Sequence, residues 1–215
     1  SFFEYIILRT GYASGLGVKE LTYLDKSDLF KKHGYYFIKN RWGGKSRARN
    51  VPIDRGTYDL LKKSFRSIKR DNNAMFVYPK KRSVKAELVG KRVSEWVVTR
   101  LVTKYKEKCG IDLERASSHT LFRRCYATHR EMMSVQTWGH SSQYEIDIDL
   151  GHNPGNRFVV PMGGPAVGGT ATAVTQTYIP FGKDPDDEPE YSLKTRAINY
   201  EKTHPLAVGE IVIED

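Results

Sequence analysis

The chain has 215 residues, of which 39% are hydrophobic and 12% aromatic, which is enough to build one domain around a packed core. No stretch approaches the roughly 20 apolar residues of a membrane span. The two cysteines, Cys109 and Cys125, are too few for a disulfide framework. Composition therefore excludes a helical membrane protein and a disulfide-rich secreted domain.

The N-terminus has neither an initiator methionine nor the basic leader and cleavage site of a signal peptide. We therefore expect a cytoplasmic or nucleoid-associated protein, and a chain that is a fragment with an upstream domain missing. Both cysteines are expected to be reduced in such a compartment.

Charge is distributed unevenly along the chain, whose formal net charge is +10. Residues 1–130 contain 30 lysines and arginines against 12 aspartates and glutamates, which leaves +18. Residues 131–215 contain 5 against 13, which leaves −8. The basic residues 1–130 favour a nucleic-acid partner, because phosphates attract clustered lysine and arginine. The acidic tail indicates a segment that docks on protein or regulates.

Helical and extended segments alternate through the first two thirds of the chain. Apolar residues at helical spacing predict helices over residues 2–13, 18–24, 93–108 and 120–133. Asp54 can cap a further helix that runs to about residue 70. Residues 35–39 and 48–53 predict a β-hairpin with a basic tip, and residues 75–79 a short extended segment.

The pattern loosens after residue 133. Residues 153–169 are rich in glycine and proline and are expected to form a long loop. Residues 170–177 are expected to form a short helix, 183–190 an acidic linker and 210–213 a terminal strand. The fold is therefore expected to be α+β, mainly helical, with a small antiparallel sheet.

A protein that breaks a phosphodiester without a metal needs a nucleophile at phosphorus, cations on the non-bridging oxygens and an acid for the leaving hydroxyl. Arginine suits the oxygens because its planar fork binds two of them and stays charged. Lysine or histidine suits the proton transfer. A tyrosine nucleophile forms a phosphotyrosyl link that conserves the bond energy, so the strand can be resealed.

Three segments supply such groups. Residues 118–129 carry His119 and Arg123 about one helical turn apart, on one face of a helix. Residues 149–153 offer His152 after a glycine, and residues 175–180 offer Tyr178 among threonines. Each of these side chains, taken alone, is more typical of a core or surface position than of a catalytic site.

Their motifs, in order, resemble the boxes of the tyrosine recombinase catalytic domain, in the phage-integrase and Xer-like group. Tyr-Ala-Ser-Gly-Leu-Gly-Val-Lys-Glu-Leu at 12–21 is similar to the first box, and Arg-Arg-Cys-Tyr-Ala-Thr-His at 123–129 to the second. Leu-Gly-His at 150–152 and Thr-Gln-Thr-Tyr at 175–178 are similar to the histidine and nucleophile boxes. Lys45 lies near the family's catalytic lysine. The resemblance runs from about residue 2 to residue 180. One such box alone would be a weak signal for the family, whereas five boxes in the family's order are a specific one.

The resemblance implies a site-specific recombinase or integrase. Tyr178 is the nucleophile that forms a 3′-phosphotyrosyl bond, and Arg123 and His152 stabilise the transition state. Lys45 protonates the leaving oxygen, with Lys39 as a weaker candidate, and His119 assists positioning or proton transfer. No metal or other cofactor is required. The basic residues expected to contact the DNA backbone are Arg41, Lys45, Arg47, Arg49 and Arg124.

Gly17 departs from the family pattern, because it stands where the first catalytic arginine grips the scissile phosphate. Loss of one such cation commonly costs ~10² to 10³ in rate. Three interpretations stay open: an engineered substitution, a natural variant in which Arg9 or Lys19 reaches the phosphate, or a protein that binds DNA without cutting it. A telomere resolvase or a type IB topoisomerase relative, which share the tyrosine chemistry, is a further alternative.

A competing histidine box lies at 135–142, where the sequence is Val-Gln-Thr-Trp-Gly-His-Ser-Ser. If His140 is the site residue, the nucleophile could be Tyr144, which is very close in sequence. We favour His152 with Tyr178, although their spacing of 26 positions exceeds the family's usual spacing of roughly three helical turns. Residues 155–169 are then an inserted loop.

The resemblance also implies partners and a domain plan. The expected substrate is double-stranded DNA, and the expected assembly is a homo-oligomer, a tetramer on paired sites, with no membrane association. The expected setting is a bacterial, archaeal or phage-encoded mobile element. Residues 1–182 are expected to form the catalytic domain, and residues 183–215 an acidic linker and tail that can be exchanged between protomers. The family's N-terminal core-binding domain is expected to lie outside this chain.

Overall fold

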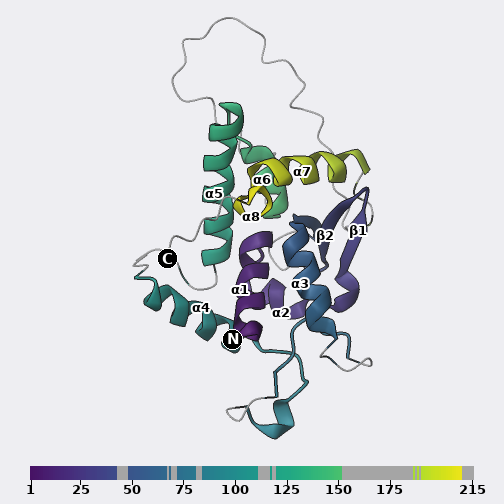
Figure 1. The fold of residues 1–215 in the computed structure, drawn as a ribbon, viewed down its shortest axis with the longest axis vertical. Coiled ribbons are helices and arrows are strands. Elements are labelled where there is room, and N and C mark those ends of the chain that lie inside the picture. Colours follow the sequence, from purple (N-terminus) through teal and green to yellow (C-terminus); the bar gives the residue numbers. More distant parts are fainter. Residues whose placement is uncertain are drawn as a thin grey trace, which may run out of the picture.

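The structure is a computed structural model that describes residues 1–42, 48–66, 68, 72–80, 84–110, 117, 120–151, 186, 188 and 190–209. A small antiparallel sheet packs against helices at one side of the molecule (Figure 1), so the expected mainly helical α+β fold is confirmed. The helices are α1 (Phe2–Ser14), α2 (Val18–Tyr23), α3 (Arg55–Phe65), α4 (Glu95–Lys108), α5 (Leu121–Trp138), α6 (Gln143–Asp149), α7 (Glu190–Thr203) and α8 (Pro205–Val208). The strands are β1 (Leu29–Lys32), β2 (Tyr35–Asn40) and β3 (Arg49–Ile53), with 3₁₀ turns η1 (Lys26–Asp28) and η2 (Ala86–Leu88).

Strand β2 lies at the centre of the sheet, between β1 and β3. Ile38 on β2 pairs with Leu29 on one side and with Val51 on the other. Strand β3 is buried along its whole length, because α1, α6 and α7 pack against it. The predicted hairpin of residues 35–39 and 48–53 is confirmed, whereas β1 was not predicted.

Helix α1 lies close to α5 and ends in a glycine turn. The Ser1 hydroxyl caps the helix by accepting a hydrogen bond from the Glu4 backbone N–H. A Cβ atom at Gly11 would lie 2.6 Å from the Phe122 ring, so only glycine allows this approach of the two helices without a shift. Gly15 ends α1 at φ 60°, in the left-handed region that glycine tolerates. The turn at 15–17 is therefore fixed beside α5.

The C-terminal helices were not predicted from the sequence. Helix α7 packs against α5 and β3. The Tyr200 hydroxyl donates to the Ala13 carbonyl at 3.0 Å, and Leu193 and Ala197 contact Phe37 on β2. Residues 190–209 are thus helical and attached to the N-terminal half of the chain. The exchange of this region between protomers stays a prediction.

Other boundaries differ from expectation by several residues. The helix after Asp54 ends at Phe65 rather than near residue 70, α5 continues to Trp138, and α6 was not predicted. The expected loop at 153–169, helix at 170–177 and strand at 210–213 lie outside the described residues, as does most of the 183–190 linker. Among the helices that the structure describes, none is both long and apolar enough to span a bilayer.

Candidate active site

The buried carboxylate of Glu20 joins the first box, the hairpin and the second box. One oxygen, Oε1, accepts hydrogen bonds from Arg49 Nη1 at 3.0 Å and from Asn40 Nδ2 at 2.9 Å. The other, Oε2, accepts from Arg123 Nη2 and from the Gly17 backbone N–H, each at 2.8 Å. Segments that are far apart in the sequence therefore meet at one carboxylate.

Local structure explains how Glu20 reaches this position. Gly17 is the N-cap of α2, and Glu20 is the third residue of the helix, from which a glutamate side chain reaches back to the N-cap N–H. An acid in the first turn also suits the positive end of the helix dipole. Arg123 lies in the first turn of α5, and Arg49 is the first residue of β3. Each charged group thus stands at the start of its element.

Two guanidiniums, those of Arg49 and Arg123, bond to the Glu20 carboxylate. Burial raises the pKa of the Glu20 carboxyl, but the Arg49 and Arg123 guanidiniums outweigh burial and hold that pKa below its ordinary value. Burial lowers the pKa of Arg49, and Glu20 offsets part of this effect, while arginine still stays charged at neutral pH. The Arg123 guanidinium, whose side chain is 23% exposed, suits a phosphate ligand.

The segment that leads into the Leu-Gly-His box is attached to the same cluster. Arg49 Nε donates to the Asp149 carbonyl at 2.5 Å. A Cβ atom at Gly15 would lie 2.9 Å from Leu150 and 2.8 Å from Tyr126, so the first-box turn packs directly on these residues. Residues up to Gly151 are described, and the chain continues to His152 from there.

The Asp149 carboxylate forms a second buried network behind this cluster. It accepts hydrogen bonds from the Tyr126 hydroxyl at 2.8 Å, from Arg130 on α5 and from Arg196 on α7. Arg196 also donates to the Asn50 carbonyl at 2.9 Å and forms an ion pair with Glu188. The network therefore ties α5, α6, α7 and β3 together.

Two tyrosines near the cluster are poor nucleophile candidates. Burial raises the pKa of Tyr126 far above its ordinary value, and the side chain is fully buried. Burial also raises the pKa of Tyr12 to about 12, and its hydroxyl lies 2.7 Å from His129 Nδ1. Both hydroxyls are thus held as hydrogen-bonding groups.

The structure brings together some of the predicted site residues and does not describe others. Gly17 and Arg123 meet at Glu20. Arg9, considered as a substitute cation, is instead held by Asp54, Thr57 and Tyr5, where α1 meets the start of α3. The predicted residues that lie outside the described part of the chain are Lys45, Arg47, His119, His152 and Tyr178.

The alternative histidine lies at the end of α5. His140 is exposed, and its ring stacks on Trp138 with centroids 5.8 Å apart. Tyr144 is in α6, and its side chain lies outside the described residues. Leu150 packs close to Gly15 of the first-box turn, and the choice between the two histidine boxes stays a prediction.

The predicted DNA contacts occupy different environments. Arg124 is exposed on α5, and Arg41 is 56% exposed and forms an ion pair with Asp28. Lys39, the weaker candidate for the catalytic lysine, forms an ion pair with Asp186. Arg49 was expected to contact the DNA backbone, but its side chain is only 4% exposed and forms an ion pair with Glu20. Its contacts with Glu20 and Asp149 draw it into the protein interior.

Glu20 and Asp149 are the site residues that the sequence analysis missed. Glu20 lies within the first box, and its position three residues after the N-cap was a signal for a capping interaction. Asp149 gave no such signal, since its partners on α5 and α7 are distant in sequence.

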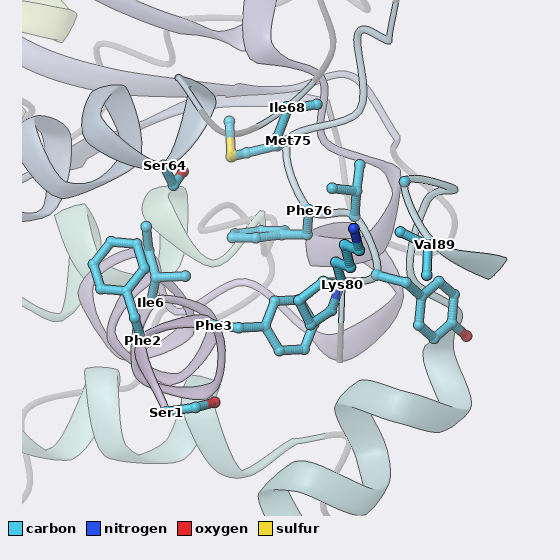
Figure 2. A pocket seen from close by; sticks show the side chains of 14 residues that line it. Ser1, Phe2, Phe3, Ile6, Ser64, Ile68, Met75, Phe76, Lys80 and Val89 are labelled. Carbon is cyan, nitrogen blue, oxygen red and sulfur yellow. The ribbon is translucent and has the colours of Figure 1, made fainter. Parts of the chain in front are cut away.

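A separate apolar pocket of about 490 Å³ lies at the opposite end of α1 from the 15–17 turn. Figure 2 shows Phe2, Phe3 and Ile6 of α1 near Met75 and Phe76, with Lys80 and Val89 along the rim. Its lining is mostly apolar and lies apart from the Glu20 cluster.

Replacing Glu20 with glutamine is expected to lower the free energy of unfolding by about 2–3 kcal/mol at neutral pH, because charge-assisted hydrogen bonds to two guanidiniums are lost. The folded-state pKa is lowered, so ionised Glu20 stabilises the fold above its ordinary pKa, and this stabilisation is lost as pH falls through the lowered value. Denaturant unfolding of Glu20→Gln and the parent should therefore differ at neutral pH and converge in acid. An equal difference at both pH values would contradict the assignment.

Comparison with known proteins places these motifs in a family. No family model matches the chain. Tyrosine recombinase XerC of Thermodesulfovibrio yellowstonii is 33% identical over 165 residues, which cover 68% of this chain and 50% of that protein. Tyrosine recombinase XerC of Pelotomaculum thermopropionicum is 30% identical over 133 residues, which cover 57% of this chain and 39% of that protein. The chain thus spans about half the length, or less, of the curated relatives it matches.

Solved structures of recombinases also align with the chain. The XerA recombinase aligns with a TM-score of 0.48 and 21% identity, over 71% of this chain and 48% of that one. The XerH site-specific recombinase bound to difH substrate, in a pre-cleavage complex, aligns with a TM-score of 0.46 and 18% identity, over 68% of this chain and 42% of that one. The ordered motifs, their meeting at Glu20 and the identity with the XerC proteins lead to one conclusion: the chain belongs to the tyrosine recombinase family.

Proposed function

We propose that this chain is the catalytic domain of a site-specific DNA recombinase that cuts and rejoins double-stranded DNA through Tyr178. The observation that carries the proposal is the Glu20 carboxylate, which holds Gly17 of the first box and Arg123 of the second. An arginine that a buried carboxylate orients beside a basic hairpin is suited to bind a phosphodiester.

In the proposed reaction, the Tyr178 hydroxyl attacks a DNA phosphorus, and its proton passes to water with His119 assisting the transfer. A 3′-phosphotyrosyl bond forms, and the bond from phosphorus to the 5′ oxygen breaks. Lys45 gives a proton to that oxygen, while Arg123 and His152 neutralise charge on the non-bridging oxygens. Attack by a 5′ hydroxyl reverses the step and reseals a strand. Glu20 acts indirectly, by holding Arg123 in place, and Arg49 in turn holds Glu20.

Gly17 is expected to limit the rate. Gly17→Arg should raise the rate of covalent adduct formation by about 10²-fold or more, because it adds a cation beside the Glu20 carboxylate. The assay is covalent capture on a pool of nicked duplexes of random sequence, resolved on a denaturing gel, for the parent chain and this variant. An adduct with either protein supports the proposal, and a faster adduct with Gly17→Arg supports the role of position 17.

A second candidate function follows from the same glycine. A chain that lacks this side chain could bind DNA without cutting it, and absence of an adduct with both proteins would favour that function. Hairpin-ended products would instead indicate a telomere resolvase, and relaxation of supercoiled DNA without exchange would indicate a type IB topoisomerase.

The proposed assembly is a homo-tetramer on paired DNA sites. Helix α7 packs on the α5 of its own chain, so exchange would require the contacts of Arg196 and Tyr200 to form between protomers instead. Mass measurements on the protein, alone and with paired duplex sites, test this proposal.

A further inference from the structure

A lysine and two aromatic side chains form an ordered stack on the surface. The Tyr23 ring at the end of α2 and the Trp42 ring after β2 are stacked, with centroids 5.5 Å apart and planes 7° apart. Lys19 Nζ lies 4.4 Å from the centroid of Trp42. Lys19 is exposed and Tyr23 is 50% exposed, so the stack faces solvent.

Lys19 differs from the neighbouring cations in what holds it. Arg9, Lys39 and Arg41 each form an ion pair with an aspartate. Within the part of the chain that the structure describes, the Lys19 ammonium lies against the Trp42 ring and forms no ion pair with a carboxylate. A ring attracts the ammonium by its quadrupole without neutralising its charge or using its N–H donors. Lys19 is therefore held in place and still able to bind an anion.

The stack lies beside the Glu20 cluster. Lys19 precedes Glu20 in the first turn of α2, and Gly17 is the N-cap of the same helix. Trp42 follows β2, whose last residue, Asn40, donates to Glu20. Helix α2 and the segment at the end of β2 therefore contribute residues to both the stack and the cluster.

We propose that Lys19, held by Trp42, binds a DNA backbone phosphate next to the Glu20–Arg123 site. This inference rests on the proposed function, because it requires DNA as the ligand. The contact supplies a cation two residues from the position that Gly17 leaves without a side chain. Trp42 and Tyr23 limit the freedom of the lysine, which reduces the entropy lost when it binds.

The test is the salt dependence of DNA binding, which needs no cleavage. Each phosphate contact releases counterions and contributes about 0.9 to the slope of log affinity against log salt on duplex DNA. Lys19→Gln should lower that slope by about 0.9, which is a 3-fold to 4-fold smaller loss of affinity between about 50 and 200 mM salt. Lys19→Arg should keep the parent slope, since arginine also stacks on tryptophan.

The matched control is Lys62→Gln. Lys62 on α3 also lies over an aromatic ring, that of Tyr58, at 5.6 Å. Fluorescence anisotropy with one labelled duplex, over a salt series, measures the parent and all variants, and thermal unfolding checks that each is folded. An equal fall in slope for Lys19→Gln and Lys62→Gln would overturn the proposal, because the loss would then follow net charge alone.

The role of the ring has its own variants. Trp42→Leu should weaken binding and keep the parent slope, because the lysine still reaches phosphate but is less ordered, and Trp42→Phe should restore affinity. A parent chain that binds duplex DNA with a steep slope, together with an unchanged slope for Lys19→Gln, overturns this inference alone. A parent chain without salt-dependent DNA binding overturns the proposed function, and this inference with it.

Discussion

Asp149→Asn is expected to lower the free energy of unfolding by about 3–5 kcal/mol, because it removes the anion that two buried guanidiniums share. The Arg130 and Arg196 side chains are 0% and 2% exposed, and both form ion pairs with this carboxylate. Asparagine keeps the shape but has no charge, and its amide N–H groups face donors of the same kind. The variant should also loosen α7, which Arg196 attaches to the core.

The matched control is Asp59→Asn on the surface of α3. Asp59 forms an ion pair with Arg55 at 3.5 Å, and the two side chains are 60% and 79% exposed. Such surface pairs contribute about 0–1 kcal/mol. Chemical denaturation of the parent and both variants compares the two sites directly. If Asp149→Asn is as stable as Asp59→Asn, the buried network does not hold the C-terminal helices to the core.

Tyr178→Phe is expected to abolish the covalent adduct and leave DNA affinity unchanged. Phenylalanine keeps the ring but lacks the oxygen that attacks phosphorus. The phosphotyrosyl bond therefore cannot form, and strand exchange cannot occur. Phosphate contacts supply most of the affinity, and they come from the basic residues rather than from the nucleophile. Covalent capture and anisotropy on the same duplex measure the two properties.

Tyr144→Phe is the control for this variant, because Tyr144 is the alternative nucleophile beside the competing histidine box. It should form adduct at the parent rate. Loss of the adduct in Tyr144→Phe, with the adduct retained in Tyr178→Phe, would reverse the assignment of the nucleophile and favour His140 over His152.

Helices with a long apolar stripe or a clear cap could be predicted from the sequence, and helices with a mixed buried face could not. Helices α1 and α5 carry apolar residues at helical spacing, and Asp54 marks the start of α3. Helix α7 buries the apolar Leu193, Ala197 and Tyr200 together with Ser192, Arg196 and Thr203. Polar residues therefore interrupt the hydrophobic pattern of its inward face, and ion pairs help to attach the helix.

Helix α6 was missed because its sequence has the wrong periodicity. Residues 145–150 alternate between acidic and apolar side chains, which is more typical of a strand than of a helix. Strand β1 was missed for a different reason, since one of its four residues is buried, one is intermediate and two are exposed. Neither segment resembles the usual pattern of the structure that it adopts.

The site residues that could be predicted are those that belong to the ordered sequence motifs. The motif order identified Gly17 and Arg123, which the structure brings to one carboxylate. The burial of Arg49 was not predictable, because its neighbours in sequence are basic and its partners lie 29 and 100 residues away, at Glu20 and Asp149. Long-range ion pairs of this kind are set by tertiary packing and leave no local signal.

The proposal that Tyr178 is the nucleophile is tested most directly by identifying the residue that carries DNA. The adduct, from the parent chain or from Gly17→Arg, is digested with nuclease and trypsin, and the peptide that retains a nucleotide is identified by mass spectrometry. Cleavage after Arg130, Arg157 and Lys183 places Tyr144 in peptide 131–157 and Tyr178 in peptide 158–183, each as the sole tyrosine. We predict the nucleotide on peptide 158–183. A nucleotide on peptide 131–157, or no adduct with either protein, would contradict the account.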